Sequence, residues 1–303
     1  MPKHVVIVGG GFGGLAAARA LRHADVSITL IDRRNHHLFQ PLLYQVATAG
    51  LAPADIAEPL RSLLRAQANC LVRLASVESV DVAAHTLKLT PVPDPDQVVS
   101  TLAPTESLAW DKLILAAGVS HAYFGNDEWE RFAPGLKTIG DALEIRRKVL
   151  TAFERAEWTE DPAERAACQT FLVIGGGPTG VELAGALAEV AFKTMRRDFR
   201  RIDTQKSRVI LLEGGGEILS SYSPALQAKA VRALERMGVH DRMNARVTKI
   251  DGSGVDLQTG ERIPAETVLW AAGVAGAPVA ASLGVPLDRA GRVPVNPDLS
   301  VEG

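Results

Sequence analysis

The hydrophobic pattern follows the same plan in two parts of the chain. In the first part, a β-branched run at residues 5–8 leads into a glycine cluster at 9–14 and an Ala- and Leu-rich segment at 15–21. A short apolar run predicts a buried parallel strand, and the segment after the glycines is typical of a helix. A second apolar run at 27–31 closes on Asp32. This part therefore predicts a strand, a tight turn, a helix and a strand.

The same order of elements recurs in the second half of the chain. A strand is predicted at 171–174, a glycine turn at 175–180, a helix at 181–192, and a strand at 208–212 that ends at Glu213. Because strands alternate with helices, we expect parallel sheets covered by helices, which is an α/β fold.

Two further apolar runs closely resemble each other. Residues 112–118 and 267–273 both predict buried strands that end in Ala-Ala-Gly. We interpret the whole pattern as an internal duplication. The remaining predicted elements are a small antiparallel layer at 71–89, a loop or hairpin insertion at 90–104, a hairpin at 247–257, and helices at 56–66, 141–157 and 225–237.

Composition and charge narrow the class of protein. The 303 residues allow roughly two domains at about 150 residues each. The 33 basic and 35 acidic residues leave a net charge of −2, whereas nucleic-acid binding needs a clear basic excess. The two cysteines, Cys70 and Cys168, cannot form a disulfide framework or a four-cysteine zinc site, so we expect a reducing compartment and no metal. No leader peptide is visible and glycines interrupt the most apolar stretch, 268–281, so we expect a soluble chain.

The first glycine cluster fits a dinucleotide fingerprint. Gly9, Gly11 and Gly14 have the G-x-G-x-x-G spacing between a predicted strand and helix. In this pattern the first glycine permits the tight turn, the second lets the backbone approach a pyrophosphate, and the third lets helix and strand pack closely. The helix N-terminus then offers free N–H groups to the phosphates. Asp32 follows 23 positions after Gly9, close to the ~20 expected for the acid that binds a ribose hydroxyl.

The second cluster repeats the fingerprint at Gly175, Gly177 and Gly180. Its acid, Glu213, comes 38 positions after Gly175, which a long first helix would explain. Glu213 would repel a 2′-phosphate and no arginine is near it in sequence, so we prefer NAD to NADP. Two fingerprints imply two dinucleotides, and the economical pair is FAD with an exchangeable nicotinamide cofactor.

Three segments carry a family resemblance, namely residues 37–50, 175–185 and 269–274. With them, nearly the whole chain resembles the type II NADH:quinone oxidoreductases, a family of two-dinucleotide-binding flavoprotein reductases. The resemblance implies two Rossmann-like domains, with the NAD domain inserted in the FAD domain. The expected boundaries are 1–135 for the first part of the FAD domain, 136–262 for the NAD domain, and 263–303 for the return to the FAD domain. We expect the returning part to be incomplete, so that the FAD domain is truncated at its C-terminal end.

The resemblance also implies which residues bind each cofactor. At FAD we expect Gly9, Gly11, Phe12, Gly13, Gly14, Asp32, Arg33, Gln40, Pro41, Leu42, Thr48, Ala117 and Gly118. At NADH we expect Gly175, Gly177, Pro178, Thr179, Gly180, Glu182, Glu213, Ala272 and Gly273. Glu182 is the expected catalytic residue, because the family places this position against the nicotinamide and flavin. The alternative for Glu182 is a structural acid in the first turn of a helix, where the dipole favours it. His36 and His37 are given no role, and the run Arg196, Arg197, Arg200 and Arg201 is expected on a solvated helix face.

The implied activity is transfer of hydride from NADH to FAD and of electrons onward to a quinone. Residues 40–50 lack the cysteine pair of a disulfide reductase, and Cys70 and Cys168 are far apart in sequence, so a disulfide acceptor is not expected. Two alternatives stay open: a non-catalytic dinucleotide-binding remnant, and an NADH reductase of a small redox protein. The resemblance further implies a cytoplasmic protein in peripheral contact with the membrane through a C-terminal region, and it leaves a homodimer open.

Overall fold

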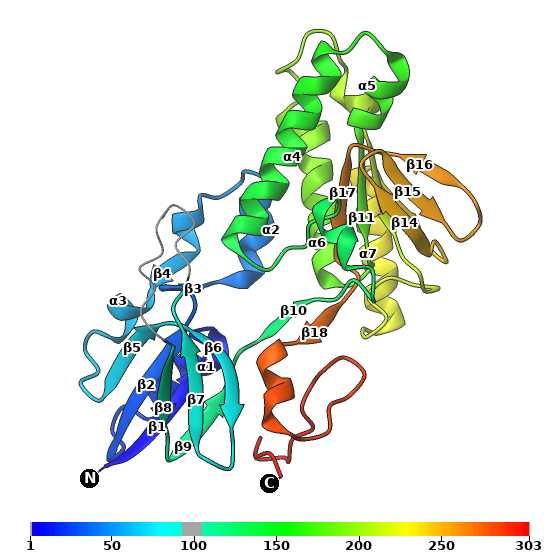
Figure 1. Ribbon diagram of the computed structural model, residues 1–303. Coiled ribbons are helices and arrows are strands. Elements are labelled where there is room, and N and C mark those ends of the chain that lie inside the picture. The colour runs from blue at the N-terminus through cyan, green and yellow to red at the C-terminus, as the bar shows by residue number, and fades with distance from the viewer. Residues whose placement is uncertain (1, 93–104, 303) are drawn as a thin grey trace. The chain divides into compact units, whose positions relative to one another are not determined.

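The computed structural model describes residues 2–92 and 105–302, with helices and strands labelled as in Figure 1. The chain divides into two compact units. Unit 1 is formed by Met1–Phe39, Ala57–Ser120 and Val274–Gly303, and unit 2 by Gln40–Ile56 and His121–Gly273. Unit 2 is therefore inserted in unit 1, and it also includes a short segment from the first half of the chain.

Unit 1 is built on a parallel sheet with the strand order β5-β2-β1-β9. Its strands are β1 (Lys3–Val8), β2 (Val26–Asp32), β5 (Cys70–Leu74) and β9 (Lys112–Leu115). In this sheet, Val8 at the end of β1 pairs with Ile31 on one side and with Leu115 on the other. Apolar side chains of β1 and β2 pack with those of α1 (Phe12–Ala20) and α3 (Leu60–Leu64) in one buried cluster. This core fixes α1 against the sheet.

Two antiparallel sheets complete unit 1, formed by β6 (Ser76–Asp81), β7 (Thr86–Thr90) and β8 (Glu106–Ala109), and by β3 (His36–Leu38) and β4 (Ala57–Pro59). The antiparallel layer predicted at 71–89 is partly wrong, because β5 pairs in parallel with β2. The helix predicted at 56–66 is reduced to α3, because β4 is extended and pairs with β3. Most of the insertion predicted at 90–104 lies outside the described residues.

Unit 2 contains a second parallel sheet, with the order β13-β12-β11-β17. Its strands are β11 (Thr170–Ile174), β12 (Arg208–Leu212), β13 (Val239–Arg242) and β17 (Thr267–Trp270). Its helices are α4 (Ile139–Trp158), α5 (Pro162–Cys168), α6 (Pro178–Glu189) and α7 (Pro224–Met237). A three-stranded antiparallel sheet of β14 (Val247–Asp251), β15 (Gly254–Leu257) and β16 (Arg262–Pro264) confirms the hairpin predicted at 247–257.

The segment Gln40–Ile56 joins unit 2 through α2 (Leu43–Ala47), which contacts both α4 and α6. Leu43, Val46 and Ala47 are fully buried. The N-terminus of α4 is closed by a capping box, in which Asp141 N donates to Thr138 Oγ1 (3.0 Å) and Thr138 N donates to Asp141 Oδ2 (2.9 Å). Two distant parts of the chain therefore form one helical layer.

The internal duplication is confirmed by the two parallel sheets. In each, the strand before the glycine turn lies between the strand that ends in the acid and the strand that ends in Ala-Ala-Gly. The registers also correspond, since Ile174 pairs with Leu212 and Trp270 as Val8 pairs with Ile31 and Leu115. The shorter elements are β10 (Val119–His121), β18 (Val274–Gly276), η1 (Gln40–Leu42), η2 (Pro53–Asp55), η3 (Asp127–Arg131), the π-helical turn η4 (Val190–Thr194), η5 (Thr204–Lys206) and η6 (Pro278–Leu283).

The packing divides the chain at other positions than the expected domain boundaries. The expected boundaries lie after residues 135 and 262, whereas unit 2 resumes at His121 and ends at Gly273. The physical reason for the second shift is that β17 pairs with β11 and therefore belongs to the sheet of unit 2. The assignment of FAD to one unit and NAD to the other stays a prediction. Among the described residues, no helix is both long and apolar enough to cross a bilayer.

Candidate functional site

The first glycine turn connects β1 to α1 and has two positions that admit only glycine. Gly9 adopts φ +105°, and a Cβ at Gly9 would overlap the carbonyl oxygen of Ala116. A Cβ at Gly14 would overlap the carbonyl oxygen of Gly9. The turn is fixed by hydrogen bonds from Gly9 N to Ile31 O (2.7 Å) and from Ala116 N to Val8 O (2.8 Å). These contacts hold α1 close to the carboxyl ends of β1 and β9.

Gly11 faces open space at the N-terminus of α1. No atom outside its chain neighbours lies within 4 Å of a Cβ built there. Gly11 is the N-cap, no side chain caps the helix, and its first turn contains no acid. Uncapped N–H groups and the positive end of the helix dipole attract an anion. The turn therefore fits the pyrophosphate of a dinucleotide, with Phe12 and Gly13 beginning the helix beside it.

Asp32 ends β2 next to this turn. Its Oδ2 accepts a hydrogen bond from Gly10 N (2.6 Å) and its Oδ1 accepts one from Arg34 N (2.7 Å). The half-buried carboxylate is thereby oriented while further lone pairs stay available for a ribose hydroxyl. The side chain of Arg33 is exposed.

An aromatic group of Phe12, His37 and Phe39 covers the first turn. Sequence reasoning named Phe12 but assigned no role to His37 or Phe39. His37 Nδ1 donates to Gly10 O (3.0 Å), and its ring meets Phe12 edge-on at 5.1 Å between centroids. Phe39 packs on Phe12 at 5.7 Å. Phe12 and Phe39 nevertheless remain 50% and 44% exposed. The pairing of β3 with β4, which sequence did not predict, is what holds this group in place.

The second glycine turn repeats the geometry of the first. Gly175 adopts φ +112°, and a Cβ there would lie 2.5 Å from Cα of Ala272. A Cβ at Gly180 would overlap the carbonyl oxygen of Gly175, and a Cβ at Gly177 would meet nothing within 4 Å. Gly175 N donates to Leu212 O (2.8 Å). No side chain caps α6, whose first residues are the exposed Pro178 and the half-buried Thr179.

Glu213 occupies the position that corresponds to Asp32. Its Oε2 accepts from Gly176 N (2.6 Å) and its Oε1 accepts from Gly215 N (2.6 Å). The neighbouring Gly214 and Gly216 meet no atom within 4 Å of a built Cβ. This acid therefore faces an open glycine loop rather than an aromatic cover.

The explanation given for the late position of Glu213 is only partly correct. The sequence predicted a helix through residue 192 and beyond, but α6 ends at Glu189 and a π-helical turn ends at Thr194. Much of the extra length is the non-helical connection 195–207, which contains only the short η5. The four arginines expected on a solvated helix face therefore lie on this connection instead: Arg196, Arg197, Arg200 and Arg201.

Glu182 is the fifth residue of α6, one position beyond the first turn that the sequence predicted for it. It is exposed, and it makes no hydrogen bond or ion pair with the described residues. Partial burial nevertheless raises the pKa of its carboxyl. The helix dipole acts mainly within the first turn, so the position of Glu182 one residue beyond it does not support the capping alternative.

The other predicted residues divide between the two units. Gln40, Pro41, Leu42 and Thr48 belong to unit 2, where Gln40 Nε2 donates to Lys137 O (3.2 Å) and Thr48 Oγ1 donates to Tyr44 O (2.9 Å). Ala117 and Gly118 follow β9 in unit 1. The roles of these residues toward a flavin stay predictions.

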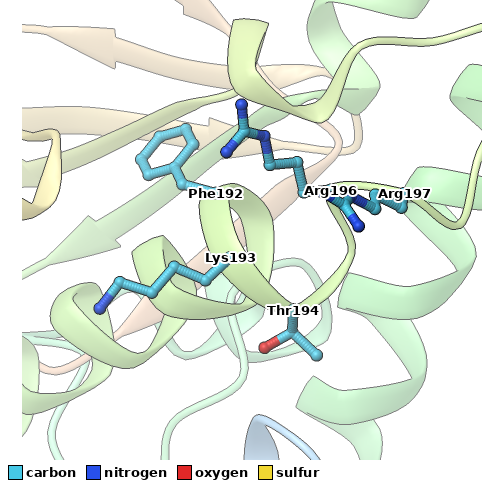
Figure 2. A pocket seen from close by; sticks show the side chains of 5 residues that line it. All are labelled: Phe192, Lys193, Thr194, Arg196 and Arg197. Atoms are coloured by element: carbon cyan, nitrogen blue, oxygen red, sulfur yellow. The ribbon is translucent and has the colours of Figure 1, made fainter.

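A separate hollow of about 430 Å³ lies at the other end of α6 and is lined by Phe192, Lys193, Thr194, Arg196 and Arg197. Figure 2 shows these side chains diverging from the turn that they share, so their charges do not converge on one point. Lys193 also pairs with Glu189 (3.2 Å). Within 2–92 and 105–302, no group of three or more His, Cys, Asp or Glu side chains is placed to hold a metal. Cys70 and Cys168 are both free, one in each unit.

Comparisons with known proteins agree with this arrangement. Residues 3–302 match the pyridine nucleotide-disulphide oxidoreductase family, and the chain belongs to that family. Within it, the chain is 48% identical to the type II NADH:quinone oxidoreductase NdhA and 46% identical to Ndh, both of Mycobacterium tuberculosis. Each match covers 99% of this chain but only 63% and 64% of those relatives. The resemblance inferred from the motifs is thus confirmed.

The fold is also shared with a solved structure. NDH2 of Plasmodium falciparum, determined in complex with NADH, matches with a TM-score of 0.84 at 21% identity, over 93% of this chain and 57% of that one. The predicted α/β fold, with one Rossmann-like unit inserted in another, is confirmed by this match and by the two parallel sheets.

Proposed function

We propose that this chain is the dinucleotide-binding part of a flavoprotein that oxidises NADH and reduces a quinone. The observation that carries the proposal is the pair of glycine turns. In each turn, two glycines leave no room for a side chain, a third glycine faces open space, and one acid is oriented by hydrogen bonds. The names of the M. tuberculosis relatives supply the direction of the chemistry. The chain spans less than two thirds of the length of these relatives. The full activity is therefore proposed for this chain by comparison with them.

FAD is the cofactor proposed for the first turn. Gly9, Gly11 and Gly14 would hold its pyrophosphate, and Asp32 would accept a hydrogen bond from its adenosine ribose. The aromatic cover of Phe12, His37 and Phe39 would lie beside it. A covered site suits a group that stays bound through many turnovers.

NADH is the substrate proposed for the second turn. Gly175, Gly177 and Gly180 would hold its pyrophosphate, and Glu213 would accept from its ribose 2′-hydroxyl while repelling the 2′-phosphate of NADPH. The open glycine loop after Glu213 suits a molecule that must leave after each turnover. Glu182 would stand on the same helix, in the role of orienting the nicotinamide or holding a proton.

The two bound groups would supply hydride transfer from the nicotinamide to the flavin, after which a quinone takes up two electrons and two protons. The protein needs no nucleophile for this chemistry, because it has to bind, orient and shield the groups. A quinone is proposed as acceptor because the relatives are named as quinone reductases.

The proposal also covers location and assembly. We expect peripheral contact with the cytoplasmic face of a membrane, where a quinone is dissolved, and association as a homodimer. Both expectations come from the family resemblance. Flotation with liposomes and analytical ultracentrifugation test them.

The deciding experiment uses the purified 303-residue chain. We expect a yellow protein whose flavin absorbance is bleached by NADH in the absence of an acceptor and restored by a soluble quinone analogue. A colourless chain that binds no FAD on reconstitution would indicate the non-catalytic remnant. Restoration by ferredoxin and not by the quinone would indicate a reductase of a small redox protein.

A further inference from the structure

Phe124 has an unusual backbone and an unusual exposure. It adopts φ +54°, in the left-handed region that a bulky side chain rarely occupies, and it is 68% exposed. Gly125, which follows it, also has a positive φ of +87°. A phenylalanine at this position gains little from burial and strains the backbone. Such an outlier is typical of a residue kept for function.

The chain before Phe124 is held firmly beside the end of β17. Ala122 N donates to Gly273 O (3.2 Å), and Trp270 Nε1 donates to Ala122 O (3.0 Å). The ring of Tyr123 stacks on Trp270 with 5.0 Å between centroids. These contacts fix the direction of the residue that follows them.

Phe124 is the exposed member of an otherwise buried aromatic cluster. Tyr123, Trp129 and Trp270 are buried, and the ring of Phe124 lies 6.0 Å from that of Trp270. The tip of the Phe124 ring lies over Gly273, because a Cβ built on Gly273 would be 2.5 Å from Cζ of Phe124. Gly273 therefore provides the space that the ring occupies, while most of the ring surface faces solvent.

The strand order places this ring on a particular side of the second turn. In the order β13-β12-β11-β17, the glycine turn follows β11, Glu213 follows β12, and Gly273 lies just after β17. A dinucleotide with its pyrophosphate at the turn and its adenosine ribose at Glu213 extends its other half in the opposite direction. That direction leads across the end of β17, next to Gly175, to the Phe124 ring.

We propose that Phe124 packs against the nicotinamide half of the dinucleotide. This contact would make the second site bind NADH in preference to nucleotides that lack a nicotinamide ring. The inference rests on the proposed function, because it takes NADH as the ligand of the second turn. An exposed aromatic ring provides a flat apolar surface for a planar ring, a contact that is favourable beyond simple burial. The strained backbone is then retained for binding, and Phe124 acts as a specificity-determining residue.

The first test measures binding of two ligands that differ in one half. NADH carries the nicotinamide ring, and ADP-ribose lacks it but keeps the parts that the glycine turn and Glu213 would hold. We expect Phe124→Leu to weaken NADH binding roughly three- to tenfold and to leave ADP-ribose binding unchanged, by calorimetric titration. Phe124→Tyr should keep the wild-type affinity for NADH. Trp158→Leu is the matched control, since Trp158 is an aromatic of unit 2 that is 80% exposed at the end of α4.

The second test separates a ligand contact from a structural role. We expect Phe124→Gly to melt at or above the wild-type temperature, because glycine relieves the positive φ, and yet to bind NADH as weakly as Phe124→Leu. Gly273→Ala should displace the ring and weaken NADH binding in the wild type. In the Phe124→Leu background the same substitution should add little, because both changes remove one contact.

The outcomes distinguish failure of the Phe124 inference from failure of the proposed function. Equal weakening of NADH and ADP-ribose, or no weakening of NADH, would overturn the role of Phe124 while leaving the second site in place. A lower melting temperature of Phe124→Gly together with unchanged NADH binding would show a purely structural residue. Failure of the wild-type chain to bind either ligand would overturn the proposed function and this inference with it.

Discussion

The two glycine turns have the same backbone but different surroundings. In both, the first and last glycines lie where a Cβ would overlap the backbone, the middle glycine faces open space, and an acid accepts one hydrogen bond from the turn and one from the residue two positions after it. The first turn is also covered by His37 and Phe12. At the second turn, the acid Glu213 is followed by three glycines.

The comparison separates the backbone geometry that the two turns share from the surrounding side chains, which differ. The shared backbone geometry is what a pyrophosphate requires, so both turns keep it. The side chains around the two turns differ, and under the proposed function they would decide how long a ligand stays and which ligand is accepted. A covered turn suits a retained cofactor, and an open turn suits a substrate that exchanges.

The largest effect is expected when one glycine turn is disrupted and the other is left intact. We expect Gly14→Ala to yield a colourless protein, because its Cβ would overlap the carbonyl oxygen of Gly9. Gly180→Ala should instead yield a yellow protein that NADH does not bleach. Each overlap should also lower the free energy of unfolding by about 2–3 kcal/mol. Flavin absorbance and its response to NADH check the pair, with Gly216→Ala as control because its Cβ meets open space. Loss of flavin from both variants alike would contradict the assignment of one dinucleotide to each turn.

The next largest effect concerns the acid of the second turn. Glu213→Ala removes a carboxylate that accepts from Gly176 N and Gly215 N. Hydrogen bonds to charged groups contribute about 1.5–3 kcal/mol, so KM for NADH should rise roughly 10- to 100-fold. The preference for NADH over NADPH should narrow, because the repulsion of the 2′-phosphate is gone.

Steady-state kinetics with both nucleotides measure this change. Glu217→Ala is the matched control, an exposed acid on the same loop. An unchanged ratio of the two KM values would show that Glu213 serves only to hold the turn.

A comparable effect, on rate rather than on KM, is expected at Glu182. Glu182→Gln should slow bleaching of the flavin by NADH about 100-fold, at the low end of effects for a positioned acid or base, while flavin content stays unchanged. Stopped-flow absorbance measures the rate, and Glu189→Gln on the same helix is the control. Loss of flavin or of fold in Glu182→Gln would favour a structural acid.

Glu182→Gln should also change how the free energy of unfolding depends on pH. Burial raises the pKa of the Glu182 carboxyl above its ordinary value of 4.5. The folded state therefore binds this proton more tightly than the unfolded state. The resulting contribution to stability is fully present below pH 4.5 and is lost as the pH rises through the folded pKa. Other carboxyls, such as Asp141 and Asp251, titrate in both proteins. Thermal unfolding should therefore show the contribution of Glu182 as a difference in stability between the wild type and Glu182→Gln that changes with pH.

The smallest effect tests the cover of the first turn. His37→Leu removes the hydrogen bond to Gly10 O, a loss of about 1 kcal/mol, and should speed dissociation of flavin roughly fivefold. Flavin release during dilution measures it, with His36→Leu as the neighbouring control. A flavin that dissociates at the wild-type rate would show that the cover does not retain it.

The sequence predicted the repeated elements because their causes are local. Short apolar runs that end in glycine, and acids that follow the next strand, are visible without any tertiary information. The parallel pairing of β5 was not visible, since its alternation fits an edge strand of either direction. The start of α6 at Pro178 was placed too late, although proline is favoured in the first turn of a helix.

Parts of the candidate site depend on contacts that the sequence does not show. His37 reaches Gly10 because β3 pairs with β4, which lies about twenty residues further along the chain. Phe124 was missed because a positive φ is expected from sequence mainly at glycine or asparagine, and because the stacking of Tyr123 on Trp270 next to it is a tertiary contact. The geometry of the glycine turns was therefore predictable from the sequence, and the surroundings that depend on tertiary packing were not.

The composition of unit 2 from two separate chain segments has a consequence for biosynthesis. Leu43, Val46 and Ala47 of α2 are buried in the folded protein, and the helices that α2 contacts begin at Ile139 and Pro178. A ribosome adding about 5–20 residues per second needs on the order of 5–20 s to make α4 after α2. During that interval the apolar side chains of this segment have no partner, and five residues are too few to stay helical on their own. The helix α2 can therefore form only after the middle of the chain has been synthesised.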